Sequence, residues 1–270
     1  MAIPLILDNR FKAVLSHDKT VPALPDICKI ISRQEGILAG IKFARDIFYL
    51  KGCRVRIIKK DGAKVKPNQT LLQVSGDAKD VLSCERTVLN LLARMSGIAT
   101  QTSLLVSKIR KINRKTKLYS TRKTAPGLRF FDTEAVAIGG GHKHRMSLND
   151  MVMIKDNHLL VSNSIENITK NARKQHRDVE VEVENQRDAM IAASSGATIV
   201  MLDNFSPAQI KKTISALQKK KLRNKVKLEA SGGINSKNIT TYAKTGVDMI
   251  SVGSITNSVS GLDLSLEVCV

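Results

Sequence analysis

Hydrophobic and polar positions follow a repeating pattern in the second half of the chain. Short β-branched runs alternate with amphipathic stretches whose apolar residues recur at helical spacing. The expected strands are Lys117–Thr121, Met151–Lys155, Val179–Glu184, Thr198–Leu202, Val226–Glu229 and Met249–Val252. The expected helices are Ser164–His176, Asn185–Ser195, Pro207–Lys220 and Ser236–Thr245. This alternation predicts βα units with a parallel sheet, arranged as an incomplete TIM-like α/β barrel.

The first hundred residues follow a different pattern. Gly52–Val74 alternates like short antiparallel strands with a turn at Asp61-Gly62, and Glu85–Ala99 has helical periodicity. The stretch Gln34–Phe48 is helical or mixed. The change of pattern predicts a domain boundary near residue 100.

Composition and charge exclude several classes of protein. No apolar run approaches the roughly 20 residues of a membrane span, and no export signal is recognisable, so we expect a cytoplasmic protein. The net charge of +20 suits a nucleic-acid binder, but only 3% of residues are aromatic and none is tryptophan, so stacking platforms are scarce. We therefore expect neither membrane nor nucleic acid as a partner. The four cysteines form no CxxC pair, which indicates neither a zinc site nor a redox motif.

Cationic residues gather around the ends of the expected strands. They are Arg122, Lys123, His144, Arg145 and Lys155. In a barrel these ends converge on one face, where active sites lie. Because like charges repel, such a cluster predicts a strongly anionic substrate, although some members could instead form structural ion pairs.

Acidic residues are expected on the same face. Glu180, Glu182 and Glu184 occupy alternate positions of one strand and so point to one side, while the intervening valines point to the other. Asp203 ends the next strand. These acids could pair with the cations, or two of them could hold a magnesium-bound diphosphate.

Glycines follow two of the late strands. Ser231-Gly232-Gly233 joins a strand to a helix, and Gly253 follows the last strand. Glycines let backbone amides approach a phosphate, and late strand ends of barrels commonly bind phosphate. By contrast, Gly139-Gly140-Gly141 is interpreted as a flexible loop.

Together these residues resemble the quinolinate phosphoribosyltransferases. The matching segments, in family order from about residue 31 to the C-terminus, are CERTVLNLLARMSGIAT, STRKTAPGLRFFDTEAVAIGGGHKHR, MVMIKDNHL, VEVEVEN, VMLDNF, EASGGI and SVGSIT. The resemblance implies an α/β fold: an N-terminal α/β sandwich over residues 1–100, joined by residues 257–270, and an open seven-stranded α/β barrel over 101–256. It also implies a homodimer with shared active sites, with assembly into hexamers left open.

The resemblance further implies the reaction and the residue roles. Phosphoribosyl pyrophosphate and quinolinate would give nicotinate mononucleotide, pyrophosphate and carbon dioxide, for NAD biosynthesis. Arg86 would reach the neighbouring subunit's site. Arg122, His144 and Arg145 would hold quinolinate's carboxylates, with Lys123 and Lys155 at the junction of the substrates. Catalysis would rest on Lys123, Lys155, Glu182 and Asp203, with Mg²⁺ as cofactor near the two acids, while Ser231, Gly232, Gly233 and Gly253 would hold the 5′-phosphate.

The chain departs from the family pattern at several positions. Thr133-Glu134 replaces a lysine and an aromatic residue, Lys143 replaces an asparagine, and the family's early acidic-glycine pattern is not recognisable around Ser16–Asp26. Two alternatives stay open: a related phosphoribosyltransferase acting on another aromatic acid, and a non-catalytic basic binding protein on the same fold.

Overall fold

The computed structural model describes residues 28–145, 151–155, 158 and 164–268. The chain forms two compact units. The first consists of Met1–Ser103, Gly127–Gly140 and Val259–Val270, and the second of Leu104–Pro126 and Gly141–Ser258. The family pattern around Ser16–Asp26 lies outside the described residues.

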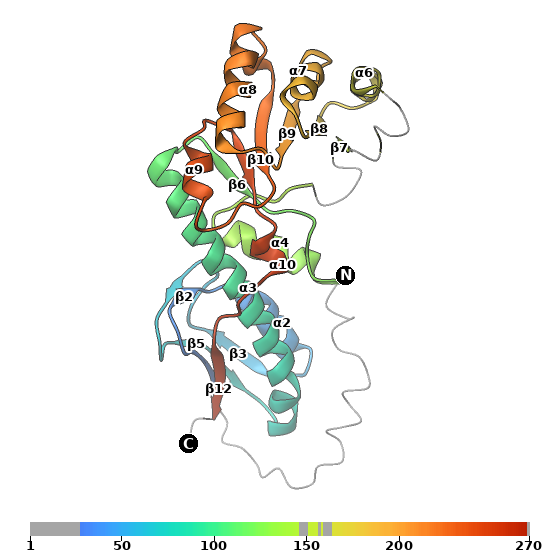
Figure 1. The fold of residues 1–270 in the computed structure, drawn as a ribbon. Coiled ribbons are helices and arrows are strands. Elements are labelled where there is room, and N and C mark those ends of the chain that lie inside the picture. The colour runs from blue at the N-terminus through green and yellow to red at the C-terminus, as the bar shows by residue number, and fades with distance from the viewer. Residues whose placement is uncertain (1–27, 146–150, 156–157, 159–163, 269–270) are drawn as a thin grey trace. The chain divides into compact units, whose positions relative to one another are not determined.

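The first unit is built on an antiparallel sheet of four strands in the order β12-β1-β5-β3 (Figure 1). Its strands are β1 (Cys28–Ser32), β3 (Arg54–Ile57), β5 (Thr70–Ser75) and β12 (Leu264–Val268), while β2 (Gly36–Ile37) and β4 (Lys64–Val65) form a separate pair. The expected strands around the Asp61-Gly62 turn are thus present, and Gly62 has the positive φ of 85° that suits glycine. Among the described strands, the last one, β12, completes the sheet beside the first one, β1, with Cys28 opposite Val268.

Three helices accompany this sheet: α2 (Ile41–Tyr49), α3 (Ala78–Ile112) and α4 (Arg129–Ile138). Helix α3 has 35 residues and extends well beyond the expected Glu85–Ala99, with its last turns in the second unit. No helix in the described part of the chain combines the length and apolarity needed to cross a bilayer.

Helix α4 was not expected, and it changes the interpretation of the glycines that follow it. Phe131 is buried and meets Phe43 edge-to-face, with ring centroids 5.0 Å apart. A side chain at Gly139 would place its Cβ 2.5 Å from the Ala99 carbonyl oxygen, and Gly140 has a φ of 87°. The triple glycine is therefore not simply a flexible loop, because it permits close packing of α4 on α3 and a left-handed helix end.

A buried ion pair links α3 to α4. The Arg94 guanidinium donates from Nε and Nη2 to the two oxygens of Asp132, at 2.7 and 2.8 Å. Asp132 is fully buried. Such a fork-to-carboxylate pair is strong, and removing Asp132 leaves the charge of Arg94, whose side chain is only 23% exposed, without its carboxylate.

Replacing Asp132 with asparagine should therefore lower the free energy of unfolding by about 3 kcal/mol, because Arg94 keeps its charge and loses its carboxylate. Urea unfolding, followed by circular dichroism, measures this loss. Asp46→Asn is the matched control, since Asp46 forms a half-exposed pair with Arg45 and should cost less than about 1 kcal/mol. If both variants lose the same free energy of unfolding, the Arg94–Asp132 pair does not stabilise the fold more than an exposed pair does.

The second unit contains a parallel sheet of six strands in the order β6-β11-β10-β9-β8-β7. Its strands are β6 (Lys117–Tyr119), β7 (Val152–Ile154), β8 (Val179–Val183), β9 (Ile199–Asp203), β10 (Lys227–Ser231) and β11 (Met249–Ser251). All six predicted strands are confirmed. The two outer strands, β6 and β7, do not pair with each other, so the barrel is open as expected. The described residues contain six strands in this sheet rather than the seven that the resemblance implies.

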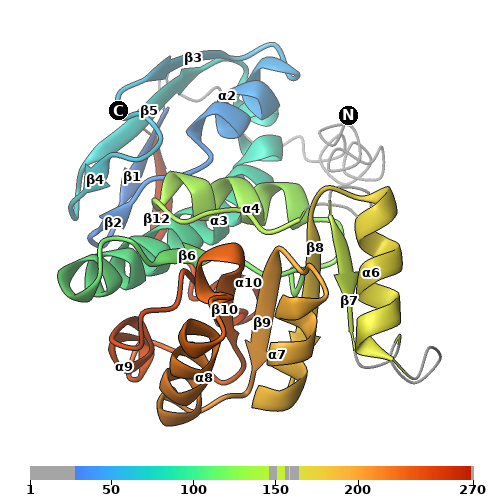
Figure 2. The same cartoon turned by 90° about the horizontal axis from the view of Figure 1, so that it is seen from above.

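Helices α6 (Ile165–Gln175) and α7 (Gln186–Ser194) contact strands β7 to β9, and α8 (Pro207–Lys219) packs against α7. The short helices α9 (Ile239–Ala243) and α10 (Ser254–Asn257) follow β10 and β11, and a 3₁₀ turn η2 (Arg223–Lys225) precedes β10. Figure 2 shows α6, α7 and α8 side by side along the strands β7 to β9. Val179, Val181 and Val183 of β8 are buried, as the alternation predicts.

Helix α9 is shorter than the predicted Ser236–Thr245. Asparagine side chains shape the segment before it: the Asn238 Oδ1 accepts from the Asn235 amide at 2.8 Å, and the Asn235 Oδ1 accepts from the Lys237 amide at 2.9 Å. These are the bonds of a helix cap at Asn235, and the Asn235 carbonyl accepts from the Ile239 amide at 3.0 Å, as in the first turn of a helix. The predicted cap at Asn235 is thus present, and the regular helix begins three residues later than predicted, at Ile239.

Candidate active site

A cavity of about 350 Å³ opens at the carboxyl ends of the parallel strands. Its lining residues are Thr121, Arg122, Lys123, His144, Arg145, Met153, Lys155, Glu182, Met201, Asp203, Glu229, Ser231 and Ser251. All of them belong to the second unit. The parallel direction of the strands brings them together, because each strand delivers its last residue to the same edge.

Eight residues that the sequence singled out line this cavity. They are Arg122, Lys123, His144, Arg145, Lys155, Glu182, Asp203 and Ser231. Arg86 does not line it, but lies exposed on α3 in the first unit. Asp156 and Asn157 of the IKDNH segment lie outside the described residues.

The cations of the cavity differ in their surroundings. Arg122 and Lys123 are exposed, and the Lys123 carbonyl accepts a hydrogen bond from the buried Thr256 hydroxyl at 2.8 Å. The Lys155 ammonium pairs with Glu182 at 2.6 Å. Arg145 is half-buried, and burial together with the charge of Arg122 lowers its pKa, against the opposing effect of Glu180 and Glu182. An anion entering the cavity would relieve this repulsion between the two arginines.

The Asp203 carboxylate is oriented by the next residue. The Asn204 Nδ2 donates to Asp203 Oδ2 at 2.7 Å, and Asn204 has the positive φ of 57°. A side chain at Gly232 would place its Cβ 2.2 Å from Asn204 Oδ1. Gly232 is thus required for the close approach of two neighbouring strand ends.

The other two glycines of the predicted phosphate site do not line the cavity, nor does Gly232. Gly233 has a φ of 62° and open space around its Cα, which suits a backbone that faces a ligand. Gly253 lies beside Lys123 and Thr121, because a Cβ added at Gly253 would be 3.4 and 3.5 Å from side-chain atoms of those residues. Gly253 thus adjoins two cavity residues, and Gly233 follows the cavity residue Ser231 by two positions.

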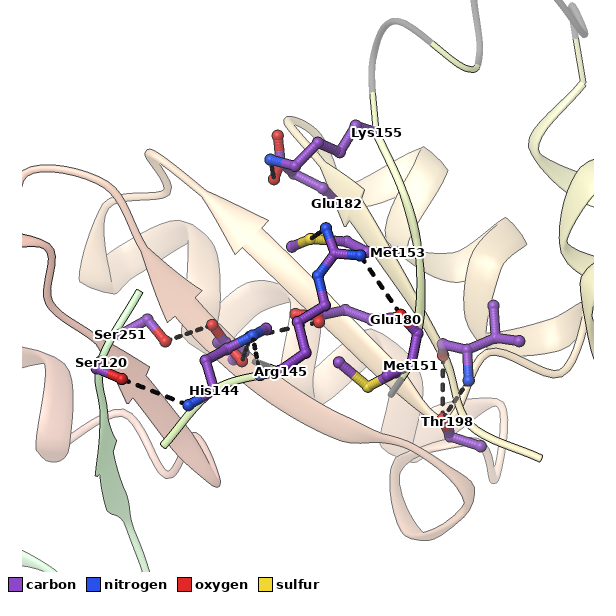
Figure 3. Close-up of polar contacts among 12 residues, drawn as sticks. Ser120, His144, Arg145, Met151, Met153, Lys155, Glu180, Glu182, Thr198 and Ser251 are labelled. Atoms are coloured by element: carbon purple, nitrogen blue, oxygen red, sulfur yellow. Dashed lines mark hydrogen bonds and ion pairs between the residues drawn. The ribbon is translucent and has the colours of Figure 1, made fainter. Parts of the chain in front are cut away.

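A buried group of three ionisable side chains lies at the floor of the cavity. Glu180 and Glu229 are fully buried, and the His144 Nε2 is 3.4 Å from Glu180 and 3.6 Å from Glu229 (Figure 3). Burial lowers the pKa of His144, but its contacts with the two carboxylates outweigh burial and raise that pKa. Burial raises the pKa of Glu180, and Glu229 adds to that effect, although His144 opposes it. Glu180 and Glu182 thus share a strand face but differ in role, since Glu180 meets His144 and Glu182 meets Lys155.

Comparison with known proteins identifies the family of this chain. Residues 17–96 match the N-terminal domain of quinolinate phosphoribosyl transferase, and residues 98–267 match its C-terminal domain. The chain belongs to the quinolinate phosphoribosyl transferase family. A relative from Methanothermobacter thermautotrophicus, named as a probable nicotinate-nucleotide pyrophosphorylase [carboxylating], is 44% identical over 260 residues, which cover 93% of each chain. The Mycobacterium leprae nicotinate-nucleotide pyrophosphorylase [carboxylating] is 38% identical over 97% of this chain and 93% of its own.

Solved structures of the quinolinate phosphoribosyl transferase family agree with the fold. The nicotinate-nucleotide pyrophosphorylase of Ehrlichia chaffeensis superposes with a TM-score of 0.89 at 32% identity, over 99% of this chain and 96% of its own. That of Francisella tularensis gives a TM-score of 0.86 at 37% identity, over 98% and 96% of the two chains. These matches confirm the predicted combination of an N-terminal sheet domain with an open α/β barrel.

One departure from the family pattern lies away from the cavity. Thr133 is buried in α4 of the first unit, and its hydroxyl donates to the carbonyls of Arg129 and Phe130 at 2.9 and 3.0 Å. Its neighbour Glu134 belongs to the same helix. This substitution therefore affects the core of the first unit rather than the lining of the cavity.

Five lining residues were absent from the predicted site: Thr121, Met153, Met201, Glu229 and Ser251. Glu229 carried a recognisable signal, since it stands in the middle of its strand between the apolar residues Leu228 and Ala230. A charged residue in such a position is costly without a partner, and so indicates one. The two methionines carried no such signal, because an apolar residue in a strand is equally typical of a core.

Proposed function

We propose that this chain transfers the phosphoribosyl group of phosphoribosyl pyrophosphate to quinolinate, releasing pyrophosphate and carbon dioxide and forming nicotinate mononucleotide. Membership of the quinolinate phosphoribosyl transferase family supports this reaction. The observation that carries it is the cavity, which gathers Arg122, Lys123, Arg145 and Lys155 at one edge of the sheet. The four lysines and arginines outnumber the three acids of the lining, Glu182, Asp203 and Glu229, and polyanionic substrates would neutralise this excess of positive charge.

The first step is substitution at the anomeric carbon of the ribose. The ring nitrogen of quinolinate forms a bond to that carbon, while the carbon–oxygen bond to the diphosphate breaks and the electron pair leaves with pyrophosphate. Positive charge develops on the ribose during this exchange. Glu182 and Asp203, at the ends of the paired strands β8 and β9, would stabilise it, and Lys123 and Lys155 would stabilise the charge on the leaving group.

The second step is loss of carbon dioxide. The new pyridinium nitrogen is positive, so the electron pair released when the neighbouring carboxylate departs is stabilised on the ring. That ring carbon then takes a proton from water. The protein's contribution is to position both substrates, and no side-chain nucleophile is required.

Magnesium fits the donor set of this cavity. The carboxylates of Glu182 and Asp203 are oxygen donors of the kind that Mg²⁺ prefers, acting directly or through water and the substrate's diphosphate. A bound ion would supply charge neutralisation for the departing pyrophosphate. The Lys155–Glu182 pair would have to rearrange as the diphosphate and its ion enter.

We also propose a homodimer in which Arg86 serves the partner's active site. Its guanidinium is exposed and belongs to the unit that does not supply the cavity, so it is available to a second chain. Assembly of dimers into hexamers and a cytoplasmic location stay predictions.

Quinolinate should be preferred strongly over nicotinate, which has only one carboxylate. With nicotinate, one of the paired cations would stay unmatched, which costs about 1–3 kcal/mol and lowers kcat/KM by about ten- to a hundredfold. Measuring pyrophosphate release with each acid, with phosphoribosyl pyrophosphate and Mg²⁺, tests this preference.

The same assay separates the alternatives. Comparable kcat/KM values for the two acids would point to a relative that uses another aromatic acid. If neither acid reacts and the protein binds nucleic acid with steep salt dependence, the chain would be a basic binding protein on this fold.

A further inference from the structure

His144 lies at the floor of the cavity, yet both of its ring nitrogens face protein groups. Nε2 lies between the Glu180 and Glu229 carboxylates, at 3.4 and 3.6 Å. Nδ1 accepts a hydrogen bond from the Arg145 main-chain amide at 2.9 Å. The imidazole is only 8% exposed, so neither nitrogen is directed at an incoming carboxylate.

The His144 Nε2 contact serves the two buried glutamates, Glu180 and Glu229, rather than a bound substrate. Both are fully buried, and among the described residues His144 is the one side chain placed to donate a hydrogen bond to Glu180. The Ser251 hydroxyl donates to Glu229 Oε1 at 2.5 Å, which leaves Glu229 Oε2 facing His144. Buried carboxylates without donors are strongly disfavoured, and the His144 Nε2–H is the donor placed between them.

A metal ion could in principle occupy the same position, since the ligand atoms of His144, Glu180 and Glu229 lie within 4.8 Å of one another. The Arg145 amide argues for a proton instead. A metal ion on Nε2 would leave the ring's proton on Nδ1, where it would meet the Arg145 N–H. The neutral ring with its proton on Nε2 avoids this conflict, because its Nδ1 is free to accept from the Arg145 N–H.

We infer that Glu180 and Glu229 are positioning residues that hold the His144 imidazole by its Nε2–H, and thereby fix Arg145 for the substrate's carboxylate. His144 and Arg145 are consecutive, and the Arg145 amide donates to His144 Nδ1. An anchored imidazole therefore fixes the position of the Arg145 backbone, from which its side chain extends. From there the guanidinium extends to the Met151 carbonyl at 3.4 Å and the Met153 sulfur at 3.3 Å (Figure 3). His144 would then act through Arg145 rather than as a direct ligand of quinolinate. Only the naming of that carboxylate rests on the proposed function.

Nitrogen-15 NMR of histidine-labelled protein tests the anchoring without any assay of activity. The chain has five histidines, and the His144→Gln spectrum identifies the signal of interest. We expect a protonated, hydrogen-bonded Nε2 that persists when quinolinate is added, and that shifts in Glu229→Gln. Glu166→Gln, at an exposed helical ion pair, is the matched control and should leave the signal in place.

Binding measurements test the consequence for Arg145. Glu229→Gln should weaken quinolinate binding about tenfold, the effect of one lost buried hydrogen bond, and leave phosphoribosyl pyrophosphate binding within about threefold. If that variant does not fold, Ser251→Ala releases one oxygen of Glu229 and should move the same signal less far.

Two results would overturn the inference. One is an Nε2–H signal that quinolinate displaces and that Glu229→Gln leaves unchanged, since His144 would then donate to the substrate. The other is a stoichiometric metal ion with an unprotonated Nε2. If the unaltered chain binds no quinolinate, the proposed function fails, while the NMR signal of the free protein still decides the anchoring.

Discussion

Replacing Asp203 with asparagine, or Glu182 with glutamine, should lower the turnover number by about a hundredfold or more, while quinolinate affinity changes much less. Each amide keeps the shape of the carboxylate but removes a charge beside the ribose, where positive charge develops in the transition state. The loss should therefore appear in kcat rather than in substrate binding.

Steady-state kinetics with both substrates, together with calorimetry of quinolinate binding, separates the two effects. Asp188→Asn serves as the control, because Asp188 lies half-buried in the first turn of α7 and does not line the cavity. An Asp203→Asn enzyme with unchanged turnover and weakened binding would show that this carboxylate acts on the ground state instead.

Mixing two inactive variants should restore activity if Arg86 acts on the partner's site. Arg86→Ala and Lys123→Ala homodimers should each be nearly inactive. In a hybrid dimer, one site has both defects and the other is intact. Random exchange makes about half of the dimers hybrids, which restores about a quarter of all sites.

Subunit exchange is verified by native mass spectrometry before the assay. Arg110→Ala is the control, since Arg110 is an exposed arginine on the same helix, and its homodimer should stay active. If verified hybrid dimers recover no activity, Arg86 acts within its own chain or has no role in catalysis. The proposal of an active site shared between subunits would then be wrong.

The strands of the second unit were predictable because each is a short run whose apolar and β-branched residues are a local signal. Strand β8 spans Val179–Val183, one residue shorter than predicted, and its valine–glutamate alternation correctly assigned the two faces. The same parallel order predicted that Lys155 and Asp203 would meet at one edge of the sheet. For this sheet, the local sequence pattern and the folded structure agree on the strands and on the edge where their polar residues gather.

What local patterns could not reveal is which distant residues become partners. The alternation shows that Glu180 and Glu182 share a face, but only the folded chain shows that one meets His144 and the other Lys155. Helix α4 was missed because its stability depends on Phe43 and Arg94, which come from elsewhere in the chain. The pairing of β1 with β12 has no local signature at all, because it joins opposite ends of the sequence.

The pairing of β1 with β12 has a consequence for the order in which parts of the chain fold during synthesis on the ribosome. The four-stranded sheet includes β12, which is synthesised only after every strand of the second unit. Chains usually fold from the amino terminus as they emerge, but here β1, the first of the described strands, must wait for β12, the last of them, before the sheet is complete. Until then β1 presents an unpaired edge, which other nascent chains can join. The parallel sheet, whose strands all lie within Lys117–Ser251, is free to assemble first.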